Sequence, residues 1–144
     1  MNAPDPNFAA RVRDSFARQK AMALIGASIS RVGPGEVEIA LPWRDDLTQQ
    51  KGFVHGGILG MIADSACGYA AFSLMPATSS LVTVEYKINI LAPAKGDLVA
   101  RGQVVRPGRT LTVTRAEVYM ADGTHVASMQ QTLMMLADTP DTAA

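Results

Sequence analysis

The segment Gly56–Phe72 limits what this chain can fold into more than any other part of the sequence. Asp64 is its one charged residue, and nearly all the others are apolar or small. A buried strand usually has only ~4–8 residues, so the length of this segment predicts a helix that is apolar nearly all round and therefore buried. Three glycines inside it each weaken a helix by about 1 kcal/mol relative to alanine. We therefore expect Gly57, Gly60 and Gly68 to permit close packing against a sheet.

Much of the remaining sequence alternates between apolar and polar residues, which is the pattern of a strand with one face on a core. Turn residues such as Pro107-Gly108 and Asp122-Gly123 separate the alternating segments, and Asp-Gly is among the stronger short hairpin signals. We predict strands over Ala27–Val32, Glu36–Leu41, Leu81–Leu91, Leu98–Val105, Leu111–Met120 and Val126–Leu136.

The segment Leu81–Leu91 makes a specific prediction about the two faces of its strand. Side chains of a strand point alternately to opposite sides, so residues two apart share a face. We expect one apolar face, formed by Val82, Val84, Tyr86, Ile88 and Ile90. The opposite face is expected to be polar and formed by Thr83, Glu85, Lys87 and Asn89.

The ends of the chain and the order of its elements predict the fold class. Residues from about 6 to 25 are expected to form an N-terminal helix, and residues from about 137 to 144 a disordered tail. Between them, Pro42–Phe53 has no clear period and is expected to be a loop. The order predicts one α+β domain over residues 1–144, with an antiparallel sheet around a long central helix. Such a sheet leaves a long edge, so pairing with a second copy is expected.

Composition makes several classes of function improbable for this chain. Thirteen basic residues balance thirteen acidic ones, so no net field favours nucleic acid or an anionic membrane. Cys67 is the only cysteine, which excludes an internal disulfide and a cysteine-rich metal site. No stretch approaches the ~20 apolar residues of a membrane helix, and the first residues do not form the apolar run of a signal peptide. We therefore expect a cytoplasmic protein with no metal site and no nucleic-acid or membrane partner.

Asp64 and the start of the long helix are the candidate chemical site. Burial of an unpartnered carboxylate costs several kcal/mol, so an aspartate in an apolar helix needs a functional or a bonding reason. A structural aspartate held by a cap or a salt bridge is the alternative. A helix N-terminus offers free N–H groups and the positive end of the helix dipole, which suits His55-Gly56-Gly57 to an oxyanion. An ordinary glycine-rich helix start is the alternative for these three residues.

Three sequence blocks carry a family resemblance: GFVHGGILGMIADSACGYA, LVTVEYKINILAPAKGD and VVRPGRTLTV. Over roughly Pro42–Leu136, the chain resembles the hotdog-fold thioesterases of the phenylacetate-degradation-related, PaaI-like type. The resemblance implies an antiparallel sheet wrapped around the central helix. It also implies a homodimer that assembles to a homotetramer, with the active site at the dimer interface. The implied reaction is hydrolysis of an acyl-CoA to a free acid and coenzyme A, with no cofactor besides the coenzyme A of the substrate.

The resemblance also implies roles for individual residues. The backbone N–H of Gly56 is expected to donate to the thioester carbonyl. Asp64, supplied by the second subunit, is expected to attack that carbonyl or to activate water as a general base. Thr83 is expected to hold the water or the carboxylate. Apart from the resemblance, the place of His55 beside a turn predicts an orienting role, in which it bonds the substrate carbonyl or fixes the loop, and not the role of a base.

Two loops are expected to contact the substrate or the attacking water. The family commonly has an asparagine just upstream of the histidine, and here the amide of Gln49 or of Gln50 is expected to replace it. In the resembling family the turn around Pro107-Gly108 lies along the pantetheine and phosphates of coenzyme A, whereas a solvated hairpin tip is the alternative. The implied substrate-binding residues are Gly57, Val82, Arg106, Gly108, Arg109 and Thr110.

Two other functions fit the same residues. A non-catalytic hotdog module would bind acyl-CoA and would not need the carboxylate of Asp64. A hotdog hydratase or dehydratase would use a histidine and a carboxylate together as base and acid, and His55 and Asp64 could supply them. The His-Gly-Gly context favours the thioesterase.

Overall fold

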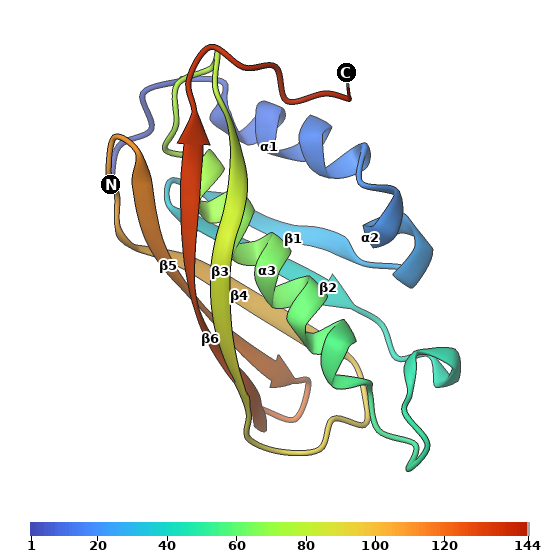
Figure 1. Cartoon of the computed structure of the whole chain (residues 1–144). Helices are drawn as coiled ribbons and strands as arrows, with labels where there is room; N and C mark the ends of the chain where they lie inside the picture. Colours follow the sequence, from blue (N-terminus) through green and yellow to red (C-terminus); the bar gives the residue numbers. More distant parts are fainter. Residues whose placement is uncertain (144) are drawn as a thin grey trace.

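The computed structural model describes residues 1–143, and Figure 1 shows them as one sheet with a long helix lying across it. Ala144, the last residue of the predicted tail, lies outside the described residues. The helices are α1 (Phe8–Ala17), α2 (Lys20–Ile25) and α3 (Gly56–Phe72), with a short 3-10 helix at Asp45–Leu47. The strands are β1 (Ser28–Gly33), β2 (Glu36–Leu41), β3 (Ser80–Ile90), β4 (Leu98–Arg106), β5 (Leu111–Met120) and β6 (His125–Leu136).

The strands form one antiparallel sheet in the order β1-β2-β4-β5-β6-β3. Figure 1 shows α3 crossing one face of this sheet, where it packs against β2, β4 and β5. The predicted α+β fold, with an antiparallel sheet around a central helix, is therefore confirmed. β1 and β3 are the edge strands. Within residues 1–143, no helix is both long and apolar enough to cross a membrane.

The close approach of α3 to the sheet occurs at Gly102 of β4. A Cβ built on Gly102 would lie 2.3 Å from the backbone C and O of Ala66, so only glycine fits between the strand and the helix. We expected the glycines of the helix itself to permit this contact. Of these glycines, Gly60 does lie close to the sheet, because a Cβ there would be 3.2 Å from the hydroxyl oxygen of Tyr86 on β3. A Cβ on Gly68 would lie 3.8 Å from a methyl group of Leu133, which is an ordinary contact. The closest approach, at β4, requires the glycine of the strand.

β3 departs from the strict alternation predicted for it, because a β-bulge shifts its register between Thr83 and Glu85. A bulge inserts one extra residue, so side chains beyond it change face relative to those before it. Thr83 and Tyr86 consequently both reach α3. Val82 and Val84 are 42% and 55% exposed. The prediction of one apolar and one polar face along the whole strand is therefore wrong.

The N-terminal region contains two helices, where one was expected over residues 6–25. The backbone of Gln19 is extended, with ψ 98°, and this residue separates α1 from α2. α2 ends at Gly26, whose φ of +80° lies in the left-handed region that favours glycine. The apolar spacing that predicted a helix is present, but the chain turns between its two parts.

The C-terminal residues 137–143, expected to be disordered, lie against α1. The carboxylate of Asp141 accepts a hydrogen bond from Ser15 and forms an ion pair with Arg18 at 3.0 Å. Ser15 also shares a hydrogen bond of 3.0 Å with the hydroxyl of Tyr69 on α3. The tail is thus tied to both helices through polar side chains, a contact that its composition did not indicate.

Arg11 of α1 joins that helix to the C-terminal end of α3. Its guanidinium donates to the carbonyl oxygens of Phe72, Met75 and Pro76 at 3.0, 2.7 and 3.0 Å. It also forms an ion pair with Asp5 at 3.0 Å and lies over the Phe72 ring. The carbonyls of Phe72 and Pro76 also accept backbone N–H groups of Met75 and Ser79, so Arg11 adds a second donor to the turn that follows α3 and ties this turn to α1.

Replacing Gly102 should destabilise the fold. In Gly102→Ala the new Cβ must push α3 away from β4, and we expect a loss of about 1–3 kcal/mol in the free energy of unfolding, as for other overpacked cores. Gly68→Ala is the matched control, because its Cβ has room and alanine favours a helix. Urea denaturation of both variants at one protein concentration checks the difference. Equal stability of the two variants would contradict this account of the packing.

Replacing Arg11 should weaken the attachment of α1. In Arg11→Lys a single ammonium group cannot reach three carbonyl groups and Asp5 together, and we expect a loss of about 1–3 kcal/mol. Arg13→Lys, at an exposed position of the same helix, is the control and should change stability little. Thermal unfolding of the two variants measures the effect, and a similar midpoint for both would show that the contacts of Arg11 add nothing.

Candidate active site

Asp64 lies in the middle of α3, on the side that faces β3 and β6, and its side chain is half-buried. The hydroxyl of Thr83 donates to Asp64 Oδ1 over 2.9 Å, and Nε2 of Gln131 donates to the same oxygen over 2.7 Å. Oδ2 accepts no hydrogen bond from residues 1–143. Asp64 also has no ion pair among these residues, so the alternative of a salt-bridged aspartate does not describe it.

Gln131 is a residue of this site that we did not select from the sequence. It lies on β6, its side chain is 1% exposed, and it contacts both Asp64 and Thr83. The signal was present, because Ala127, Met129 and Leu133 share its face of the strand and are all buried. A glutamine in line with three core residues indicates a buried polar group, and such a group has a hydrogen-bonding partner.

His55 caps the start of α3. Its Nδ1 accepts a hydrogen bond of 2.8 Å from the backbone N–H of Gly57. Because Nδ1 is the acceptor, the neutral ring carries its proton on Nε2, and this N–H is free to donate elsewhere. Gly57 is an expected substrate-binding residue, and its N–H is already occupied by His55 within the chain.

Gly56 is the first residue of α3, and its N–H donates to no acceptor among residues 1–143. A Cβ built here would lie 2.7 Å from Cδ1 of Ile90, so the end of β3 leaves little room for a side chain. The free N–H stands at the positive end of the helix dipole, which is the position that favours a negatively charged oxygen.

The two candidate glutamines differ in their surroundings. Oε1 of Gln49 accepts a hydrogen bond from the backbone N–H of Lys51, and its own N–H donates to the carbonyl of Phe53 at 2.8 Å. Gln49 is half-buried, whereas Gln50 is exposed. Gln49 thus shapes the loop that leads into α3 and retains its Nε2 hydrogens as donors.

The turn between β4 and β5 lies beyond the other end of α3. It borders an apolar groove together with Leu74 and Met75, which follow the helix. Gly108 is required there, since a Cβ would lie 2.0 Å from the carbonyl oxygen of Leu111. Arg106 and Arg109 are exposed and form no ion pair within residues 1–143. Thr110 is also exposed, and its carbonyl accepts from Met135 N–H at 2.8 Å.

Distances along α3 separate the expected functional groups within one chain. Asp64 is eight positions after Gly56, which is about 12 Å at the rise of an α-helix. Phe72 is a further eight positions along, and the Arg106–Thr110 turn lies near this other end of the helix, beside Ala71 and Leu74. One chain therefore brings together Asp64, Thr83 and Gln131, but it does not bring Gly56 or the turn to the carboxylate.

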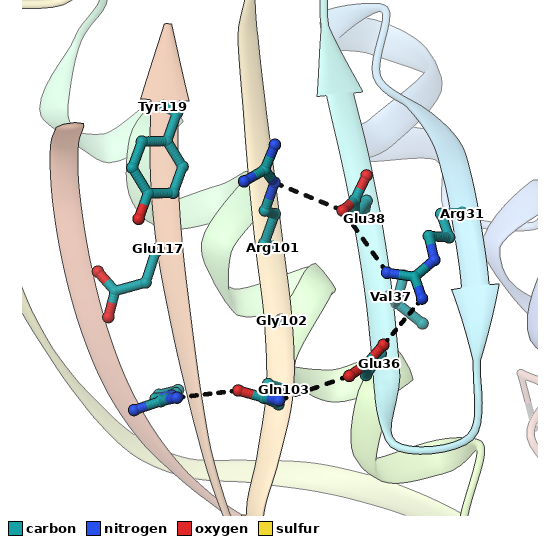
Figure 2. Close-up of a pocket in the computed structure, with 10 residues that line it drawn as sticks. Arg31, Glu36, Val37, Glu38, Arg101, Gly102, Gln103, Glu117 and Tyr119 are labelled. Atoms are coloured by element: carbon teal, nitrogen blue, oxygen red, sulfur yellow. Dashed lines mark hydrogen bonds and ion pairs between the residues drawn. The ribbon is translucent and has the colours of Figure 1, made fainter. Parts of the chain in front are cut away.

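A charged hollow on the opposite face of the sheet is a separate feature (Figure 2). Its side chains pair with one another, since Arg31 lies 3.1 Å from Glu36 and Arg101 lies 3.4 Å from Glu38. The dashed lines in Figure 2 follow this network from Arg31 on β1 to Gln103 on β4, which also accepts a hydrogen bond from Arg115 on β5. Its charges are largely neutralised within the network, and the sheet separates it from Asp64, so it is not the candidate active site.

Cys67 is not a candidate nucleophile. It is fully buried in α3, and burial raises the pKa of its thiol to about 12. The thiolate is the reactive form of cysteine, so this side chain is inert near neutral pH and fills the core.

Within residues 1–143, His, Cys, Asp and Glu side chains form no cluster of three that could hold a metal ion.

Comparisons with known proteins identify the family of this chain. Residues 51–127 match the model of a family described as the thioesterase superfamily. A protein of Halobacterium salinarum named "Putative esterase" is 33% identical over 117 residues, which are 74% of this chain and 78% of that protein.

Solved structures show the same fold. A thioesterase family protein from Silicibacter pomeroyi is 51% identical, with a TM-score of 0.87 over 90% of this chain and 98% of that one. The E. coli PaaI protein from the phenylacetic acid degradation operon is 20% identical, has a TM-score of 0.86 over 92% and 96% of the two chains, and shares the fold. Since the family model covers more than half of the sequence, the chain belongs to the thioesterase superfamily and has its hotdog fold.

Proposed function

We propose that this protein is an acyl-CoA thioesterase that hydrolyses a thioester to a free acid and coenzyme A. The observation that carries the proposal is the carboxylate of Asp64, which has two donors on Oδ1 and a free Oδ2 in the middle of an apolar helix. Membership of the thioesterase superfamily supports a thioester as the substrate. Oδ2 either attacks the thioester carbon itself or takes a proton from a water molecule that attacks it. In the first case the C–S bond breaks, coenzyme A leaves as the thiolate, and water then hydrolyses the anhydride formed between the acyl group and Asp64 to the free acid. In the second case water becomes bonded to the acyl carbon, the C–S bond breaks, and the proton that Asp64 took passes to the departing sulfur.

The start of α3 is proposed to stabilise the charge that develops in this reaction. Attack on the thioester carbon moves negative charge to the carbonyl oxygen, so the catalyst needs donors already aimed at that oxygen. The N–H of Gly56 is such a donor, since it has no acceptor among residues 1–143. His55 supports it by capping the helix, and its Nε2–H can donate to the substrate.

Two chains are needed to build this site. Reacting groups must come within about 3.5 Å of each other. Within one chain, Gly56 and Asp64 are separated by about 12 Å of helix, so a single thioester cannot contact both. We propose that a second copy supplies the start of its own α3 to the Asp64 of the first, so that a homodimer has two shared sites.

The surface around β3 supports this pairing. β3 is an edge strand with unpaired backbone groups, and Val82, Val84, Tyr86 and Ile90 on it are 42–55% exposed. Open edges and contiguous apolar surface mark interaction sites. β3 also carries Thr83 of the site, so covering this strand with a second copy would enclose the carboxylate. Assembly of two such dimers into a tetramer stays a prediction of the family resemblance.

The turn between β4 and β5 is proposed to bind coenzyme A. Arg106 and Arg109 are exposed and lack ion pairs within residues 1–143, so their charges are available to phosphate oxygens. Gly108 keeps the backbone of this turn close to Leu111. The groove beside Leu74 and Met75 is apolar and would suit the uncharged pantetheine part of coenzyme A.

Removing the carboxylate should abolish hydrolysis. We expect Asp64→Asn and Asp64→Ala each to lower turnover by at least about 10²-fold, the effect of losing a catalytic base or nucleophile. Thiol release from a panel of acyl-CoA thioesters measures it. Asp14→Asn, an exposed position on α1, is the control and should retain wild-type turnover. Full activity of Asp64→Ala would refute the mechanism, and binding of acyl-CoA without hydrolysis by the wild type would favour the non-catalytic module.

Complementation between two inactive variants tests whether the site is shared. Asp64→Ala lacks the carboxylate, and Gly56→Pro lacks the backbone N–H. Proline at the first position of a helix does not break the helix, so this second variant should fold. In a co-expressed mixture half of the dimers contain one chain of each kind, and one of their two sites has both groups. We expect recovery of about one quarter of wild-type thiol release.

Gly56→Ala is the control for this experiment, because it adds the same Cβ near Ile90 and keeps the N–H. It should be more active than Gly56→Pro. Mixed dimers detected by native mass spectrometry without any recovery of hydrolysis would contradict a site shared between chains.

A further inference from the structure

Gln131 is buried beside Asp64, and each polar hydrogen of this group has a defined place. One hydrogen of Nε2 points to Asp64 Oδ1 over 2.7 Å and the other to the Thr83 hydroxyl oxygen over 3.1 Å. Thr83 therefore accepts from Gln131 and donates its own hydrogen to Asp64 over 2.9 Å. The three side chains form a closed ring of hydrogen bonds in which donors and acceptors match.

We propose that Gln131 is a positioning residue, which holds the Asp64 carboxylate so that Oδ2 faces the substrate. The inference rests on the proposed function of Asp64. Both hydrogen bonds end on Oδ1, so rotation of the carboxylate about its bond to Cβ would break two bonds at once. Oδ2 remains the oxygen without a donor from residues 1–143 and is the one that can reach water or the thioester carbon.

The orientation of the Gln131 amide is determined by its neighbours. With the amide reversed, Oε1 would face a carboxylate oxygen, and two acceptors repel each other. In the orientation present, Oε1 is buried and has no hydrogen-bond partner among residues 1–143. An unpaired buried acceptor costs folding free energy. The arrangement thus favours the contact with Asp64 at the expense of an unsatisfied atom.

Because the unpaired Oε1 costs folding free energy, an experiment can distinguish a positioning role of Gln131 from a purely structural one. Methionine has nearly the shape of glutamine, and Met129 and Leu133 flank position 131 on the same buried face. Gln131→Met loses the bond to Asp64 but also removes the unpaired acceptor and keeps the volume, and Thr83 still donates to Asp64, so these effects offset each other and stability should change little. If Gln131 only stabilises the fold, stability and turnover should fall together. If it positions Asp64, turnover alone should fall.

The experiment compares Gln131→Met with Gln130→Met, the same substitution one residue away on the exposed face of β6. For Gln131→Met we expect kcat to fall by about 10-fold or more, since small displacements of catalytic groups have large effects. We expect KM within about 2-fold of the wild type and a thermal midpoint that is not lowered, because neither binding surface nor core is lost. Gln130→Met should match the wild type in all three.

Two further variants keep the inference testable. Gln131→Asn retains an amide on a side chain too short to reach Asp64, so its kcat should fall as well. This variant replaces Gln131→Met in the comparison if Gln131→Met does not fold. In the Asp64→Ala background, Gln131→Met should lower the residual rate no further, because the two residues act as one unit.

The outcomes distinguish this inference from the proposed function. Loss of activity in Asp64→Ala with an unchanged kcat in Gln131→Met would overturn the role of Gln131 and leave the thioesterase proposal intact. A fall in kcat that is matched by a lower thermal midpoint would also overturn it, in favour of a structural glutamine. Wild-type turnover in Asp64→Ala would remove the proposed function, and the positioning role with it.

Discussion

The contact between α3 and β4 is the constraint on which the rest of this structure depends. A helix can lie this close to a strand only where the strand has no side chain, and Gly102 supplies that gap beneath the backbone of Ala66. The distance between α3 and the sheet then determines which side chains of the helix are buried and which contact other strands. Leu59, Ile62 and Ala63 are buried with almost no exposure, and Asp64 emerges on the side toward β3 and β6. The core and the candidate active site are therefore set by one packing event.

The same geometry is the basis for proposing a site that two chains share. A rigid helix keeps its N-terminal donors and its central carboxylate about 12 Å apart, whatever the side chains do. The β-bulge after Thr83 brings that hydroxyl to the carboxylate and leaves Val82 and Val84 exposed on the edge strand. One irregularity thus completes the polar side of the site and the apolar surface proposed to receive a second copy.

Much of the fold could be predicted, and the misses have physical causes. Strand positions followed from period-two alternation, and α3 from its length and apolar composition, because both patterns report local burial. The two faces of β3 were predicted wrongly, since a bulge is a pairing event between strands and leaves little trace in one of them. Gln131 was missed although its spacing with Met129 and Leu133 indicated a buried position. Its partner, Asp64, lies on another element, and the spacing of residues along one strand does not indicate which residues of other elements lie nearby.

The sequence by itself determined the positions of the strands and of α3, the buried residues outside β3, and that one carboxylate lies in an apolar helix. These properties depend on neighbours along the chain and on the tendency of apolar side chains to leave water. Only the tertiary structure decided which groups meet. Asp64, Thr83 and Gln131 are far apart in sequence, and they share a ring of hydrogen bonds because α3, β3 and β6 pack together. That packing results from interactions summed over the whole chain, so no single segment contains it.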